Sequence, residues 1–166
     1  MNSVGKWTYG HEGIRIIGNQ SKLKIGNICS IAEGCVYFLG AYHRRDWNTS
    51  FPFGHIHQHV FNNFDGQGHP KSNGDVIIGN YVWIGKNVSI MSGVNIGDGA
   101  YLAANSHIVK DVLPYSIVGG NPAKFIKWRF DEERRKKLIE MKWWEWDDNK
   151  INQNLKWLCS DQFPIE

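Results

Sequence analysis

The chain has 166 residues, a net charge of +3 and a sequence pI near 8.7, which indicate one domain with room for a compact core. No apolar run approaches the ~20 residues of a membrane span and no basic, apolar and small-residue leader is present, so we expect a cytoplasmic protein without membrane insertion. The mild positive charge does not imply a nucleic-acid partner, and we expect none.

Residues 1–37 show the first sign of a six-residue repeat. VGKWTY begins at Val4, and the repeat resumes clearly in IGNICS and IAEGCV, which start at Ile25. Cys29 and Cys35 both occupy the small fifth position of these hexads, which favours buried packing residues over catalytic nucleophiles. Three cysteines are too few for a disulfide framework, so we expect free thiols.

Residues 38–75 leave the repeat and are rich in glycine, asparagine, histidine and aromatic residues. A long excursion inside a repeat protein is usually functional or disordered, and the aromatic content argues against disorder. His55, His57 and His59 alternate, so in an extended segment all three would share one face and could bind zinc. No nearby run of Asp, Glu or Cys completes such a site, and we favour solvated or stacked histidines.

Residues 76–119 contain the clean repeat, which consists of seven consecutive hexads from Ile78 to Gly119. The first position is Ile or Leu in six of them, and the fifth is always small or β-branched. A six-residue period fits a short strand and a tight bend stacked coil on coil, which predicts a parallel β-helix with the first-position side chains inside. Ile25 and Ile78 are 53 residues apart, which is not a multiple of six, so the excursion must shift the register.

The last part of the chain, from residue 120, has a different pattern. Asp131 predicts a helix N-cap, and the apolar stripe of Leu138, Ile139 and Trp143 predicts a helix over roughly 132–145. Such a helix must dock, either on an open end of the β-helix or on a neighbouring subunit. We favour the open end, where exposed strand edges invite further pairing. The predicted parts are a β-helix over 1–129, its inserted active-site loop over 38–75, and a helical tail over 130–166.

Five segments together carry a resemblance to a known family. They are HRRDWNTSFPF at His43–Phe53, VWIG at Val82–Gly85, AANS at Ala103–Ser106, GGNPA at Gly119–Ala123 and KWWEW at Lys142–Trp146. In these segments the chain resembles the hexapeptide-repeat acyltransferases, in the xenobiotic acetyltransferase branch that includes chloramphenicol and streptogramin acetyltransferases and related sugar O- and N-acetyltransferases. The chain begins almost at the first hexad, without the longer N-terminal segment that helps antibiotic-modifying members form their acceptor pocket, which disfavours a drug acceptor.

The resemblance implies an all-β, left-handed parallel β-helix assembled as a homotrimer, with acetyl-CoA in a groove between subunits and no metal requirement. It implies His43 as the general base for direct acyl transfer, which suits a side chain that titrates near neutrality. Asp46, three residues on, could orient the imidazole, although an Asp in a polar loop more often caps a turn.

The resemblance also implies which residues contact the donor and the acceptor. The cofactor-binding residues are Trp83, Lys86, Ala104, Val109, Lys110, Lys124 and Lys127. The substrate-binding residues are Tyr42, Trp47 and Phe51, whose rings could stack on a pyranose. The alternatives are that Trp83 packs at a subunit contact and that Lys124 and Lys127 are a solvated basic stretch.

The sequence thus predicts an acetyl-CoA-dependent O- or N-acetyltransferase that acts on a sugar, such as a nucleotide-sugar or polysaccharide precursor. The alternative within the same chemistry is acetylation of an antibiotic of the chloramphenicol or streptogramin kind. A zinc hydrolyase of the γ-carbonic-anhydrase kind would need histidines on facing coils, whereas only His107 lies in the clean repeat. A non-catalytic solenoid would leave the loop unexplained.

Overall fold

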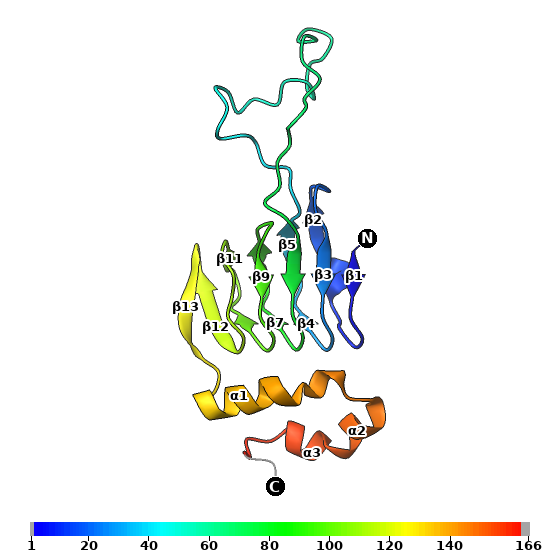
Figure 1. Cartoon of the computed structure of the whole chain (residues 1–166), viewed down its shortest axis with the longest axis vertical. Coiled ribbons are helices and arrows are strands. Elements are labelled where there is room, and N and C mark those ends of the chain that lie inside the picture. Colours follow the sequence, from blue (N-terminus) through cyan, green and yellow to red (C-terminus); the bar gives the residue numbers. More distant parts are fainter. Residues whose placement is uncertain (1, 164–166) are drawn as a thin grey trace.

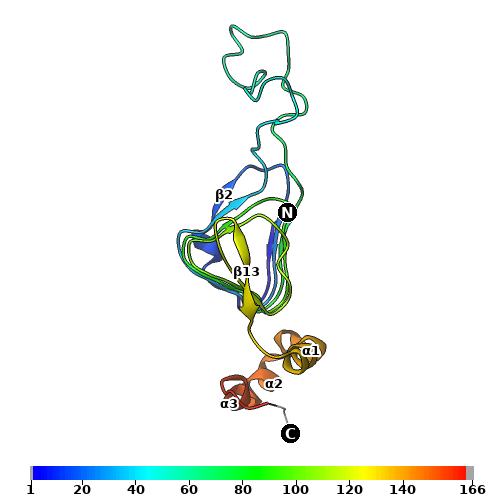
Figure 2. The ribbon, with the colours of Figure 1, turned by 90° about the vertical axis from the view of Figure 1, so that its left-hand side faces the viewer.

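The computed structural model describes residues 2–163, which form a three-sided prism of stacked coils. A long loop projects from one corner of the prism and short helices follow another corner (Figure 1). Figure 2 views the coils along the prism axis, where the sheets enclose a roughly triangular core. No helix within the described residues is long and apolar enough to cross a membrane.

Each side of the prism is one sheet. The first sheet contains β1 (Ser3–Val4), β3 (Leu23–Ile25), β6 (Val76–Ile78) and β9 (Asn95–Ile96). The second contains β4 (Ser30–Ile31), β7 (Trp83–Ile84), β10 (Tyr101–Leu102), β12 (Ser116–Gly120) and β13 (Ala123–Trp128). The third contains β2 (Arg15–Ile17), β5 (Val36–Phe38), β8 (Ser89–Ile90) and β11 (His107–Ile108). Neighbouring strands pair in parallel, except that β12 and β13 are antiparallel.

The hexad positions fill the prism core as predicted. First-position side chains such as Ile84 and Ile90 and fifth-position side chains such as Val82 and Val88 are at most 1% exposed. Trp83 pairs with Tyr101, 18 residues later, so three hexads make one coil. Every coil therefore contributes the same pattern of aliphatic side chains to one continuous core.

The buried cysteines belong to this core. Cys29 and Cys35 are at most 1% exposed, and burial raises the pKa of both thiols. A thiol with a raised pKa is a poor nucleophile at neutral pH, so the predicted packing role is confirmed. The described cysteines are free of disulfide bonds.

The inserted loop interrupts the coil without disturbing the stacking. Ile25 of β3 pairs directly with Ile78 of β6, although 53 residues separate them. One coil needs only 18 of these residues. The others form the loop, which leaves the prism after β5 and returns at β6, at the corner between the third and first sheets. The predicted register shift is therefore confined to the loop.

Another corner carries an outward row of apolar turn residues. Ile28, Tyr81 and Tyr115 occupy equivalent bends with positive φ angles of 57°, 54° and 55°. Their side chains pack with buried residues of the tail, namely Leu138, Trp143 and Trp144. This second apolar cluster lies outside the prism core, between the corner and the tail helices.

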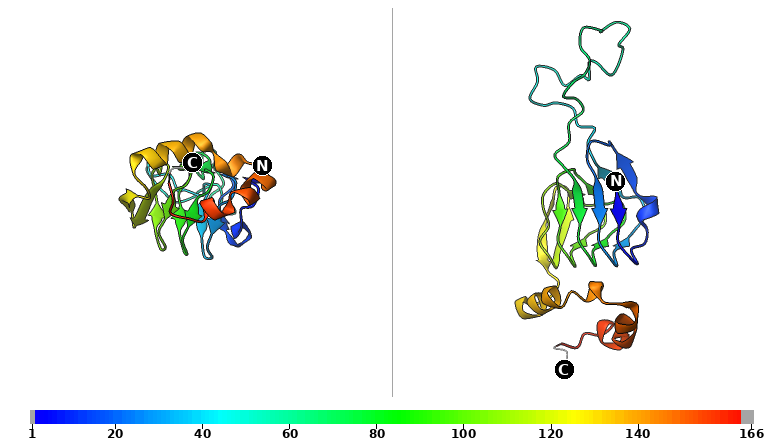
Figure 3. Two further views of the ribbon diagram at one scale, coloured as in Figure 1. Left: turned by 90° about the horizontal axis from the view of Figure 1, so that it is seen from below. Right: turned by 45° about the vertical axis from the view of Figure 1, so that its right-hand side comes forward.

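The tail helices follow this corner instead of covering an end of the prism, so the predicted capping role is wrong. They comprise α1 (Glu132–Met141), a 3₁₀ turn (Trp143–Glu145), α2 (Asp148–Gln153) and α3 (Leu155–Leu158), and α1 runs across the stack of coils (Figure 1, Figure 3). The tail tryptophans pack on the apolar turn residues, which lie along this corner. The last coil is already covered, because β13 pairs with β12 at the edge of the second sheet. Residues 164–166 of the predicted tail domain and residue 1 of the predicted β-helix domain lie outside the described residues.

The ends of α1 are set by local geometry. Asp131 caps the helix as predicted, because its side chain accepts a hydrogen bond from the Arg134 amide. The helix ends at Met141 and not near residue 145, since Lys142 adopts a left-handed conformation with φ 46°. Of the predicted apolar stripe, Leu138 is buried, whereas Ile139 is 36% exposed.

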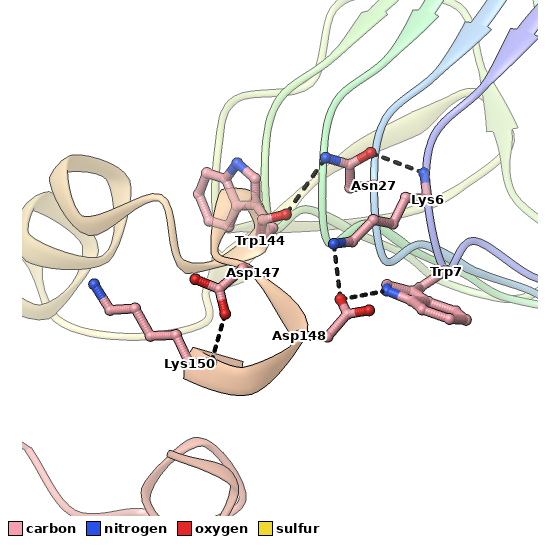
Figure 4. Close-up of polar contacts among 7 residues, drawn as sticks. All are labelled: Lys6, Trp7, Asn27, Trp144, Asp147, Asp148 and Lys150. Atoms are coloured by element: carbon pink, nitrogen blue, oxygen red, sulfur yellow. Dashed lines mark hydrogen bonds and ion pairs between the residues drawn. The ribbon is translucent and has the colours of Figure 1, made fainter. Parts of the chain in front are cut away.

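Polar contacts join the tail to the first coil (Figure 4). The Asp148 carboxylate at the start of α2 accepts from Lys6 Nζ at 2.8 Å and from Trp7 Nε1 at 3.1 Å. Both donors lower the pKa of Asp148. Asn27 Nδ2 donates to the Trp144 carbonyl at 3.4 Å, so the two ends of the chain are held together along the same corner.

Replacing Ile90 by alanine should lower the free energy of unfolding by about 2–5 kcal/mol, because the change removes fully buried methylene groups and leaves a cavity in the prism. Urea denaturation followed by circular dichroism measures this difference. The matched control is Ile139→Ala on the exposed side of α1, which should change the free energy by less than about 1 kcal/mol. Equal stability of the two variants would contradict the assigned core.

Candidate active site

The neck of the inserted loop is a short pair of antiparallel segments. Tyr42 and Lys71 exchange two backbone hydrogen bonds of 3.1 and 2.9 Å. The Tyr42 hydroxyl accepts a hydrogen bond from the amide of buried Ser92 at 2.8 Å, which ties the neck to the prism. The next residue, His43, is therefore placed at a defined point above this corner.

His43 is exposed and held in one orientation. Its Nδ1 lies 2.7 Å from the carbonyl oxygen of Ser50. A carbonyl oxygen can only accept, so in the neutral imidazole Nδ1 carries the proton and Nε2 keeps its lone pair. This is the tautomer that a general base needs, and the Ser50 carbonyl is a partner that the sequence analysis did not find.

Asp46 does not contact this imidazole. Its carboxylate forms a two-point ion pair with Arg44, with Nε–Oδ1 at 2.7 Å and Nη2–Oδ2 at 2.6 Å. The Arg44 hydrogen bonds lower the pKa of Asp46 to about 2, so the carboxylate stays charged near neutral pH. The Ser50 carbonyl, and not Asp46, therefore has the orienting position.

The predicted acceptor residues are divided between two hollows. His43 and Tyr42 lie with Arg45, Lys71, Asn73 and Met91 around a cavity of about 730 Å³. Trp47 and Phe51 lie with Phe53 and Phe64 around a second cavity of about 480 Å³, and Asp46 borders both. The structure therefore does not bring Tyr42, Trp47 and Phe51 together as one aromatic wall.

Two of these predicted acceptor residues also have structural partners. The Tyr42 hydroxyl is occupied by the Ser92 amide, as described above. The Arg44 guanidinium lies 4.8 Å from the ring centroid of Trp47 and covers one of its faces. Phe51 is 41% exposed and keeps a free surface.

Three of the predicted donor residues lie on or beside the second sheet. Trp83 is 53% exposed and stacks on Tyr101 of the next coil, with ring centroids 4.1 Å apart at 17°. Lys86 and Ala104 lie in adjacent coils, where the Asn105 amide donates to the Lys86 carbonyl at 2.8 Å. The Lys86 ammonium forms an exposed ion pair with Glu33.

The other predicted donor residues lie toward the last coil. Val109, Lys110 and Lys124 line a cavity of about 380 Å³ together with Leu113 and Phe125. Lys127 lies on β13 opposite Ile117 and is exposed. Leu113 and Phe125 are 59% and 53% exposed, and the sequence motifs gave no reason to select them.

The structure separates His43 from Trp83 within one chain. The loop leaves the corner between the third and first sheets, because it connects β5 to β6. Trp83 lies on β7 of the second sheet, which is the side of the prism across from that corner. Figure 2 shows the loop pointing away from the coils, so the predicted base and donor residues do not form one pocket in a single chain.

The alternating histidines do not lie in one extended segment. His55 and His59 lie in turns, and His57 between them has a positive φ of 54°. His55 Nε2 is hydrogen-bonded to the His69 carbonyl at 2.8 Å. Within residues 2–163, no group of three or more metal-ligating side chains gathers in a suitable arrangement.

Comparisons with known proteins place this fold and loop in a family. The family model "Bacterial transferase hexapeptide (six repeats)" matches residues 75–110. A probable macrolide acetyltransferase from Lysinibacillus sphaericus is 48% identical over 150 residues, which cover 84% of this chain and 78% of that protein. A chloramphenicol acetyltransferase from Morganella morganii is 43% identical over 141 residues, which cover 84% of this chain and 67% of that protein.

A crystal structure of a hexapeptide-repeat-containing acetyltransferase from Vibrio cholerae superposes with a TM-score of 0.57 at 25% identity. The match covers 78% of this chain and 64% of that one, so the present chain spans a little under two thirds of its length. The stacked six-residue coils and these relatives indicate the same class of protein. The chain belongs to the hexapeptide-repeat acetyltransferases, and it is an acetyltransferase.

Proposed function

We propose that this acetyltransferase transfers the acetyl group to a hydroxyl or amine of an antibiotic, with His43 as the general base. The observation that carries the catalytic part is the 2.7 Å contact between His43 Nδ1 and the Ser50 carbonyl, which leaves Nε2 free to accept a proton. The ring is exposed beside a cavity large enough for a small-molecule acceptor.

The reaction is a direct transfer. His43 Nε2 takes the proton of the acceptor group while the acceptor oxygen or nitrogen bonds to the thioester carbonyl carbon of acetyl-CoA. The resulting tetrahedral intermediate collapses as the carbon–sulfur bond breaks. The imidazolium then returns its proton to the departing thiolate, which yields coenzyme A and the acetylated acceptor. No covalent acyl-enzyme is needed, because the base activates the acceptor itself.

Two observations favour an antibiotic over the sugar predicted from the sequence. The relatives at 43–48% identity bear the names of macrolide and chloramphenicol acetyltransferases. In addition, the aromatic wall on which the sugar prediction rested is divided between two hollows, and one face of Trp47 is covered by Arg44. The antibiotic alternative is therefore better supported than the sugar.

We also infer that the working enzyme is a homotrimer with active sites between subunits. The argument is the separation of His43 from Trp83, since a second copy must supply the donor side if both take part. In this arrangement Trp83, Lys86 and Ala104 would line the pantetheine arm, and Val109 and Lys110 would follow. We also propose that the coils of the β-helix wind in the left-handed sense.

The lysines of the last coil are the proposed phosphate contacts. Lys124 and Lys127 are exposed on β13 and carry mobile point charges suited to the nucleotide phosphates of coenzyme A. Lys124 borders the cavity that also holds Val109 and Lys110. Lys86 is a weaker candidate for an ionic contact, because Glu33 already pairs with it.

Replacing His43 by alanine should lower turnover by about 10²–10⁴-fold, because no base then removes the proton from the acceptor substrate. Binding of acetyl-CoA should stay close to normal, since the proposed donor residues lie elsewhere in the fold. Single-turnover kinetics and calorimetry with a non-hydrolysable acetyl-CoA analogue measure the two quantities. Turnover within threefold of the unaltered enzyme would refute His43 as the base.

A panel of acceptors should separate the antibiotic from the sugar. We expect acetyl transfer to at least one of chloramphenicol, a streptogramin A and a macrolide, detected as a 42 Da mass gain by mass spectrometry. Amino and hydroxy sugars form the comparison arm, and their values of kcat/KM should be at least about 100-fold lower. Preferred acetylation of a sugar would overturn the antibiotic assignment and leave the acetyl-transfer chemistry intact.

A further inference from the structure

A second histidine of the loop lies against His43. Tyr42 and Lys71 fix the spacing of the two arms of the neck through their paired backbone hydrogen bonds. His43 follows Tyr42 on one arm, and His69 lies two residues before Lys71 on the other. The two imidazoles meet edge to face, with centroids 5.2 Å apart and an interplanar angle of 84°.

The His69 ring makes no hydrogen bond of its own. Both of its nitrogens are shielded from solvent and have no hydrogen-bond partner among residues 2–163. The ring also contacts Trp47 and His55, with centroid distances of 6.4 and 5.4 Å. Burial, followed by the nearness of the ionisable groups of His43, His55 and Arg44, lowers the pKa of His69, which favours the neutral imidazole.

The backbone around His69 is held from several directions. Its amide donates to the Gly66 carbonyl at 3.0 Å, and its carbonyl accepts from His55 Nε2 at 2.8 Å. The preceding Gly68 carbonyl accepts from Arg44 Nη1 at 3.1 Å, while the same guanidinium holds Asp46. The backbone that carries the His69 ring is therefore held by contacts that do not include His43.

The place of the His69 ring beside the proposed base affects how the His43 ring can rotate. Rotation of the His43 imidazole about its Cβ–Cγ bond would move Nδ1 away from the Ser50 carbonyl, and a half-turn would put Cδ2 in the place of Nδ1 and Cε1 in the place of Nε2. The His69 ring meets the His43 ring edge to face with centroids 5.2 Å apart, so we expect it to hinder this rotation. The tautomer of a histidine is set by the hydrogen bond of its other nitrogen, so holding Nδ1 in place also holds Nε2 unprotonated.

We propose that His69 is a positioning residue, which keeps the His43 imidazole in the orientation and tautomer required of the base; this proposal rests on the proposed function of His43. It predicts that the shape of the ring matters and its nitrogens do not. His69→Phe should therefore substitute for histidine, whereas His69→Ala should not.

The first test is kinetic. His69→Ala should lower kcat by about 10–100-fold and change the KM for acetyl-CoA by less than about twofold, because only the geometry of the base is altered. His69→Phe should restore kcat to within about threefold of the unaltered enzyme. The matched control is His59→Ala, since His59 is an exposed loop histidine whose ring neighbours His57. Equal kcat values for His69→Ala and His59→Ala would overturn the proposal.

The second test reads the tautomer directly, by nitrogen NMR of histidine-labelled protein. In the unaltered enzyme and in His69→Phe, His43 should show a protonated Nδ1 and an unprotonated Nε2, while His69→Ala should show a mixture of tautomers. An unchanged His43 signature in His69→Ala would overturn the proposal. The neck amides of Tyr42 and Lys71 should keep their protection from hydrogen exchange in His69→Ala, and loss of that protection would show a folding role instead.

The two proposals fail in different ways. If His43→Ala kept normal turnover, the general-base assignment would fall, whereas the NMR signature would still report whether His69 fixes the His43 ring. If His43→Ala lost turnover while His69→Ala kept both kcat and the tautomer, only the positioning role would fall.

Discussion

The register between coils is the constraint on which the rest of the structure depends. Residues 18 apart pair in parallel strands, so each buried isoleucine or valine stacks on its equivalent in the next coil. A shift by one residue would turn these side chains outward and expose the core. Each side of the prism thus keeps the same six-residue pattern from coil to coil, and the inserted loop leaves where the chain bends between two sides.

The corners of the prism perform different tasks. One corner releases the loop between β5 and β6, and the paired neck and the Tyr42 hydroxyl tie that loop back to the coils. Another corner presents Ile28, Tyr81 and Tyr115, which form a second apolar cluster with the tail. Because the turn residues face outward, they can be changed for function without repacking the prism core.

The fold could be predicted from the sequence because the hexad is a local, repeated pattern. The buried first and fifth positions, the packing role of Cys29 and Cys35, and the Asp131 cap all follow from residue type and spacing. The place of the tail could not be predicted in this way, since it depends on side chains that reach the same corner from distant coils. The apolar stripe indicated that the helix docks, but it did not identify the surface on which it docks.

The candidate site was predictable only in part, for a related reason. His43 could be selected from the loop motif, whereas the Ser50 carbonyl that orients it belongs to the backbone and has no sequence signal. Asp46 was considered for this role because of its spacing, yet the neighbouring Arg44 binds the carboxylate more directly. The contact between His43 and His69 joins the two arms of an irregular loop, and no period relates those arms.

In the proposed mechanism the enzyme depends on the meeting of two surfaces that one chain keeps apart. The loop carries the proposed base, and the second sheet and last coil carry the proposed donor contacts. A chain that lacks one surface should therefore be able to complement a chain that lacks the other. This dependence is the central claim about how the fold produces catalysis.

Subunit complementation tests that claim most directly. Separately inactive His43→Ala and Ala104→Trp chains, the second blocking the proposed pantetheine face, are co-expressed with different tags and purified as mixed assemblies. Each mixed trimer keeps one complete site of three, so acetyl transfer should be restored to about a third of the activity of the unaltered enzyme. Mixed assemblies no more active than either parent variant would contradict the account.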